Sequence, residues 1–146
     1  MPIVAAVDRS DQATAIIEQA GQLGAAFEEP VHVVHVLTRK EFVSLERTNV
    51  TKSGSAVPIE EIEAIAEEIA AEAIEDAGAD ADAIGLVGKP AEEIVTYAET
   101  VDADYVVVGG RKRSPVGKAL FGSVAQSVIL SAESPIVMVK PPEKPA

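Results

Sequence analysis

The sequence contains no cysteine and very few aromatic residues. Without cysteine, it has no disulfide framework and no thiol chemistry. Aromatic side chains make up 3% of the 146 residues, although 47% are hydrophobic. A core must therefore be built mainly from Val, Ile, Leu and Ala, which is typical of a buried parallel sheet between Ala-rich helices.

Long apolar runs and positive charge are also scarce. Asp, Glu or Gly interrupts each apolar run within about ten residues, so we expect no membrane-spanning helix. Asp8 and Arg9 interrupt the first run too early for a signal peptide. The net charge of −12 argues against binding to nucleic acid or to an anionic membrane. We expect a soluble, cytoplasmic protein; its acidity is compatible with salt adaptation and equally with plain solubility.

Short runs rich in Val and Ile alternate with longer amphipathic stretches. The short runs predict strands over residues 2–7, 31–37, 83–87, 105–108 and 135–139. The longer stretches predict helices that begin near Ser10 or Asp11, at Pro58, after Lys89-Pro90 and near Ser123. This alternation predicts an α/β fold, a single doubly wound five-stranded parallel sheet of Rossmann-like type with helices on both faces. The domain is expected to cover residues 1–140, and the Pro-rich tail 141–146 to be disordered.

Ligands in such sheets bind at the carboxyl ends of the strands, where the strand order reverses. The loops after the first, second and fourth strands are therefore the candidate positions. A metal site is not predicted, because His32 and His35 lie three apart on one strand and would point to opposite faces.

The segment from Val108 to Ser123 is the most informative part of the chain. Gly109-Gly110 ends the fourth strand, and Gly122-Ser123 opens the next helix, whose first amides would attract an anion. Four of the chain's twelve basic residues lie between them: Arg111, Lys112, Arg113 and Lys118. Alternatively, the glycines form only a strand exit, Ser123 only caps the helix, and the basic residues balance nearby carboxylates.

This segment resembles the nucleotide-binding signature of the universal stress protein family: G-x-x-G, nine residues, then G-[ST]. Gly109 matches the first glycine and Gly122-Ser123 the closing pair, whereas Lys112 stands in place of the second glycine. The strand before Asp8, the strand over 32–36 and the ending over 134–139 also have counterparts in the family. The resemblance therefore extends over nearly the whole chain.

The resemblance implies a stress-response protein that binds ATP with Mg and forms a homodimer through the strand Pro135–Val139. It implies the following site residues: Ala6, Val7, Val36 and Val108 at the adenine, Asp8 beside the ribose or adenine, and Gly109, Gly122, Ser123 and Val124 at the phosphates. Charge alone adds Arg111, Lys112, Arg113 and Lys118 on the phosphate side. The alternatives are sheet core for the four apolar residues and helix capping for Asp8. No catalytic residue is assigned.

Lys112 leaves two outcomes open. A side chain there would block the pocket or strain the backbone if the position needs a positive φ, or it would add charge toward the phosphates. Besides an ATP-binding regulator, two hypotheses therefore remain. One is an interaction dimer that binds no nucleotide; the other is a weak ATPase or an enzyme that phosphorylates itself at Ser114, Ser123 or Ser127.

Overall fold

Five parallel strands form one sheet in the order β3-β2-β1-β4-β5. The structure, a computed structural model, describes residues 1–8, 12–38, 40–41, 43–44, 58–110 and 122–140. The strands are β1 (Ile3–Ala6), β2 (Val31–Leu37), β3 (Asp82–Val87), β4 (Tyr105–Gly109) and β5 (Ile136–Val139). The predicted doubly wound parallel sheet is therefore confirmed.

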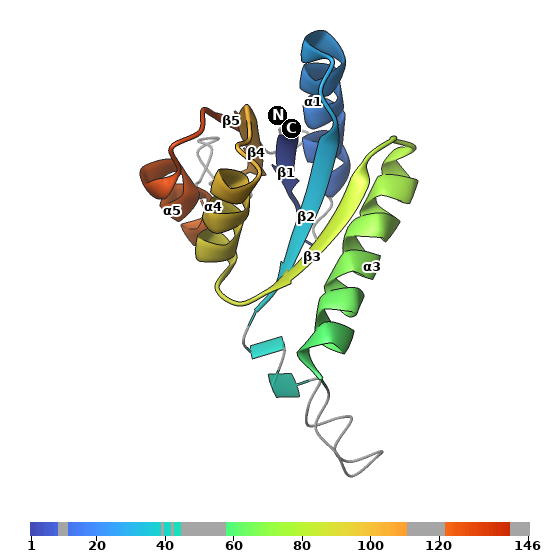
Figure 1. Cartoon of the computed structure of the whole chain (residues 1–146), viewed down its shortest axis with the longest axis vertical. Helices are drawn as coiled ribbons and strands as arrows, with labels where there is room; N and C mark the ends of the chain where they lie inside the picture. Colours follow the sequence, from blue (N-terminus) through green and yellow to red (C-terminus); the bar gives the residue numbers. More distant parts are fainter. Residues whose placement is uncertain (9–11, 39, 42, 45–57, 111–121, 141–146) are drawn as a thin grey trace, which may run out of the picture.

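Helices cover both faces of the sheet, as the sequence predicts (Figure 1). They are α1 (Ala13–Phe27), α3 (Ile59–Ala77), α4 (Pro90–Thr100) and α5 (Ser123–Ser131). α1 and α3 pack on one face and α4 and α5 on the other, each pair burying its own cluster of Val, Ile and Ala side chains. In the described part of the chain, no helix is both long and apolar enough to cross a bilayer.

The predicted start of α1 and the predicted cap of α5 differ from the structure. α1 begins at Ala13 with Gln12 as its N-cap residue, so it starts later than the prediction near Ser10 or Asp11, and residues 9–11 lie outside the described residues. α5 begins at Ser123, as the sequence predicts, but its N-cap residue is Gly122, so the hypothesis that Ser123 caps this helix is wrong. Glycine is among the residues commonly found at N-cap positions. The predicted disordered tail, 141–146, lies outside the described residues.

A glycine in β3 lets α3 lie directly on the sheet. A Cβ atom added to Gly85 would lie 2.2 Å from the Glu63 carbonyl oxygen and 2.3 Å from the Glu67 nitrogen. Both atoms belong to the α3 backbone, which cannot move aside as a flexible side chain can. The buried alanines Ala66 and Ala70 of α3 allow the same close approach from the helix side.

We predict that Gly85→Ala destabilises the protein by about 3 kcal/mol, because the new methyl group would push α3 away from β3. The matched control is Gly21→Ala, within α1, where the added Cβ meets no atom within 4 Å. This control is expected to raise the free energy of unfolding by about 0.5–1 kcal/mol, since alanine favours the helix. Urea unfolding of both variants measures the difference; equal effects would contradict the close packing.

Candidate functional site

The strand order reverses beside β1, the central strand. From β1 the chain continues outward to β2 and β3 on one side, and then returns to β4 and β5 on the other. Ala5 is in register with Val33 of β2 and with Val107 of β4. The carboxyl ends of β1, β2 and β4 therefore lie side by side, and the crevice expected in a doubly wound sheet falls between β1 and β4.

The predicted adenine-side residues reach this edge, but their side chains lie on different faces. Val36 and Val108 are buried in the cluster covered by α4 and α5, and half-buried Ala6 packs against that cluster. Val7 belongs instead to the cluster beneath α1 and α3. A ligand on the α4–α5 side would therefore meet Val7 through its backbone. Asp8, next along the chain, is exposed at the same edge.

Gly109 is needed for packing whether or not a ligand binds. A Cβ atom added there would lie 2.6 Å from the Gln12 Oε1 and 2.8 Å from the Ile16 Cδ1. The first turn of α1 thus lies against the end of β4, beside the crevice. This contact could not be predicted from the sequence, because it depends on how α1 crosses the sheet.

The N-terminus of α5 can receive an anion. Gly122 is extended, with φ −71° and ψ 160°, and its carbonyl accepts a hydrogen bond of 3.0 Å from the Gln126 amide. The amides of Ser123 and Val124 lie in the first turn, where an α-helix supplies no acceptor. Both residues are exposed, and this turn contains no acidic side chain that would oppose an anion. Of the predicted phosphate-side residues, Arg111 and Lys112 lie outside the described residues, as do Arg113 and Lys118.

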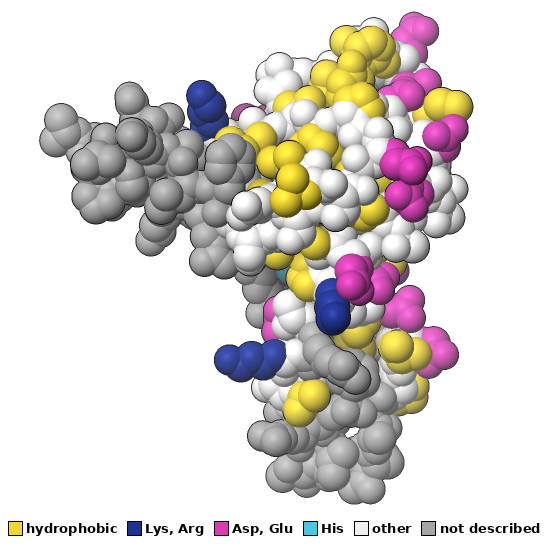
Figure 2. All heavy atoms as spheres, turned by 90° about the vertical axis from the view of Figure 1, so that its left-hand side faces the viewer, with side chains coloured by type: hydrophobic (Ala, Val, Ile, Leu, Met, Phe, Trp, Pro, Cys, Tyr) yellow, Lys and Arg dark blue, Asp and Glu magenta, His cyan; other side chains and the backbone are white. Residues whose placement is uncertain are grey.

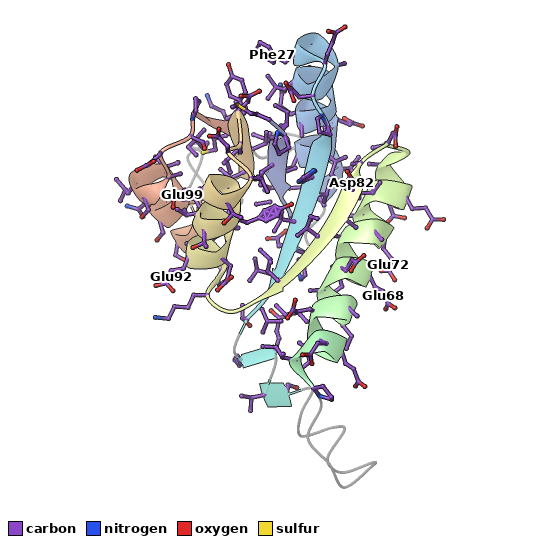
Figure 3. All side chains as sticks on the ribbon, viewed as in Figure 1. Phe27, Glu68, Glu72, Asp82, Glu92 and Glu99 are labelled. Carbon is purple, nitrogen blue, oxygen red and sulfur yellow. The ribbon has the colours of Figure 1, made fainter. Side chains whose placement is uncertain are left out.

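An open groove of about 600 Å³ runs between α4 and α5 and includes this helix start. Ser123 and Val124 line it together with Thr96 and the pair Lys89 and Glu92, whose charged atoms are 4.0 Å apart. Glu92 points outward from the start of α4 (Figure 3). None of the lining residues comes from β1, β2 or β4. The groove therefore adjoins the predicted phosphate end of the site and not its adenine end.

The two histidines take separate positions, as the sequence predicts. The His32 Nδ1 is 2.7 Å from the hydroxyl of Tyr97 on α4, whereas the His35 Nδ1 is 2.9 Å from the Val7 carbonyl oxygen. Burial, and then the nearby Asp82 carboxylate, raise the pKa of Tyr97 above its usual value. No group of three His, Cys, Asp or Glu that could hold a metal occurs among the described residues.

Comparison with known proteins identifies the family. Residues 1–140 match the model of the universal stress protein family. This chain belongs to the universal stress protein family. A universal stress protein from Methanocaldococcus jannaschii is 31% identical over 142 residues, which cover 97% of this chain and 83% of that protein. The resemblance drawn from the glycine motif is thus confirmed at the level of the family.

Solved structures agree with this assignment. A universal stress protein from Archaeoglobus fulgidus superimposes with a TM-score of 0.66 at 33% identity, covering 94% of this chain and 97% of that one. A universal stress protein from the same organism in complex with dAMP gives a TM-score of 0.62 at 29% identity, covering 94% and 96%. The Rossmann-like α/β fold is therefore shared with proteins of this family.

We predict that Gly109→Ala destabilises this universal stress protein by about 1–2 kcal/mol, because its methyl group meets the ends of two side chains that can shift only partly. Ile16→Val removes the nearest carbon atom of Ile16 and should itself cost about 1 kcal/mol. The double variant should lose less stability than the sum of the losses in the two single variants, as measured by urea unfolding in a double-mutant cycle. Strict additivity would show that the two positions are not in contact.

Proposed function

We propose that this universal stress protein binds ATP at the carboxyl ends of β1, β2 and β4 and acts as a regulatory protein of the stress response. One observation carries the proposal: the strand order reverses between β1 and β4, and the segment that follows β4 leads to the exposed N-terminus of α5, whose N-cap residue, Gly122, has no side chain. An adenine at the strand ends and phosphates at a helix N-terminus match this arrangement. The dAMP complex of the relative from Archaeoglobus fulgidus supports an adenine nucleotide.

The residues fall into two parts of the proposed site. On the adenine side, Ala6, Val36 and Val108 offer apolar surface, Val7 the peptide that it shares with Asp8, and Asp8 a carboxylate for the ribose or adenine. On the phosphate side, α5 offers the amides of Ser123 and Val124, and Gly109 and Gly122 allow close backbone approach. The sequence adds Arg111 and Lys112 to this side by their charge.

Magnesium would enter this site with the phosphates. Mg²⁺ keeps several waters and is usually held by one or two carboxylates together with substrate phosphates. Asp8 is a carboxylate at this edge, and the described residues contain no cluster that would hold the ion by protein groups alone. The ion would offset phosphate charge in a protein whose own net charge is −12.

We assign no catalytic base, so any hydrolysis would be slow. We place the protein in the cytoplasm.

The phosphate position is tested by adding a negative charge at the start of α5. Val124 is 37% exposed and lies in the first turn, where glutamate suits the helix dipole. We predict that Val124→Glu leaves stability intact and weakens Mg·ATP binding at least about tenfold by repelling the phosphates. Isothermal titration calorimetry measures the dissociation constants.

The control is Gln22→Glu, an exposed position on α1 that changes the net charge equally, and its affinity should match that of the unmodified protein. Equal affinities for Val124→Glu and Gln22→Glu would show that the phosphates do not lie at the start of α5. No binding by the unmodified protein, with binding gained by Lys112→Gly, would favour the alternative of an interaction dimer that works without nucleotide.

We also propose a homodimer formed through β5. This strand is at the edge of the sheet, and its residues Ile136–Val139 are only half-buried within one chain. The preceding helix exposes Ile129 and Leu130, at 38% and 78%. Hydrophobic side chains are visible across this side of the molecule (Figure 2). An apolar edge strand that stays unpaired would invite association, so a second copy pairing with it satisfies the strand's backbone groups.

The backbone of β5 shows which residue to change. The carbonyls of Pro135 and Val139 accept hydrogen bonds from the amides of Val106 and Gly110, so these carbonyls face β4. Because backbone groups alternate in direction along a strand, the amide of Met138 faces away from β4. Met138→Pro removes this outward donor and spares the pairing with β4.

We predict that the unmodified protein sediments as a dimer in analytical ultracentrifugation, and that Met138→Pro shifts it to the monomer. Met138→Leu keeps the amide and a similar volume, and is expected to remain dimeric. A monomeric unmodified protein, or a dimer that survives the proline, would contradict pairing through β5.

A further inference from the structure

His35 is a buried histidine beside the proposed site. It is 5% exposed, and among the described residues it is the only polar or charged side chain that is buried. It lies on β2 directly before Val36. Side chains alternate along a strand, so His35 shares the face of Val33 and Leu37, beneath α1 and α3. Packing alone would be served by a leucine at this position.

The contact of His35 with β1 fixes which ring nitrogen carries a proton. Its Nδ1 is 2.9 Å from the Val7 carbonyl oxygen, and a carbonyl oxygen only accepts hydrogen bonds. Nδ1 therefore carries a hydrogen and donates it. The other nitrogen, Nε2, is buried and has no hydrogen-bond partner within the described part of the chain. In the neutral ring Nε2 is then a bare acceptor, and an unsatisfied buried acceptor lowers stability.

This hydrogen bond holds the peptide that joins Val7 to Asp8. The register of β1 with β2 ends at Ala6 and Val34, and the Val7 amide still donates to the Val34 carbonyl at 2.9 Å. The bond from His35 then anchors the carbonyl of the same residue, one step beyond the paired strand. A trans peptide is planar, so its carbonyl and the following amide point in opposite directions. Anchoring the Val7 carbonyl therefore turns the Asp8 amide away from His35 and β2. The amide then points to the side of β1 on which β4 lies.

We infer that His35 is a positioning residue for the nucleotide site. Its Nδ1–H fixes the plane of the Val7–Asp8 peptide, and thereby the direction in which the chain presents Asp8 to the crevice between β1 and β4. The unpaired Nε2 lowers stability, but it comes with this role, because a histidine ring that provides the Nδ1 donor always also contains Nε2. The inference rests on the proposed function, because it concerns how that site is held.

Two substitutions separate positioning from packing. His35→Asn keeps a nitrogen donor at the place of Nδ1, whereas His35→Leu keeps the volume and loses the donor. We expect His35→Leu to weaken Mg·ATP binding about tenfold, the effect of one net hydrogen bond, and His35→Asn to restore most of the affinity. The control is His32→Leu, on the same strand and bonded to Tyr97, which should bind like the unmodified protein.

The readouts are isothermal titration calorimetry, thermal unfolding without nucleotide, and the ring ¹⁵N NMR spectrum. We expect the NMR spectrum to show the Nδ1–H tautomer. We also expect the Mg·ATP affinity of each variant to depend on whether position 35 has a hydrogen-bond donor, and not on the melting temperature of the variant. An Nε2–H tautomer, or equal affinity of His35→Leu and the unmodified protein, would overturn the role of His35 alone. If the affinity falls equally in both His35 variants and the melting temperature falls with it, the role of His35 is only structural. No binding by the unmodified protein would instead overturn the proposed function.

Discussion

The pairing of β1 with β2 on one side and β4 on the other is the constraint on which the rest of the structure depends. Ile3, Val4 and Ala5 are completely buried, and their backbone groups hold together the two halves of the sheet. Since all strands are parallel, this pairing aligns three carboxyl ends at one edge. The proposed ligand residues at Asp8, Val36 and Gly109 are distant in sequence and become neighbours only through β1.

A core with few aromatic side chains achieves its packing by close approach of helices to the sheet. Gly85 lets the α3 backbone lie on β3, and Gly109 lets the first turn of α1 lie on the end of β4. The two glycines lie on opposite halves of the sheet. Large exposed acidic side chains, such as Glu68 and Glu72 on α3, point outward from this packing (Figure 3). Much of the negative charge is thus carried by solvated helix faces.

Most of the fold could be predicted from the sequence, because runs of Val and Ile alternate with amphipathic stretches and few other folds accept that alternation. The starts of α3, α4 and α5 agree with the predictions. The N-cap residues of α1 and α5 could not be predicted, because N-cap preferences are weak: Gln12 and Gly122 take positions for which Ser10, Asp11 and Ser123 were the better candidates. The strands were placed to within one or two residues of their observed ends.

The candidate site was predicted in outline and not in detail. The glycine motif predicts a phosphate end, which stays a prediction, whereas the strand order that defines the edge is confirmed. The face to which Val7 points and the bond from His35 to its carbonyl depend on strand register, which a single sequence does not specify. The contact of Gln12 and Ile16 with Gly109 depends likewise on the crossing of α1 over β4.

The central claim, an adenine nucleotide held between the strand ends and the start of α5, is tested most directly by amide NMR of the unmodified protein during titration with Mg·ATP. The account predicts that the largest shifts fall on Asp8, Val36, Gly109, Ser123 and Val124, at the two ends of one site. Shifts confined to the groove between α4 and α5, or no shifts at saturating nucleotide, would contradict it.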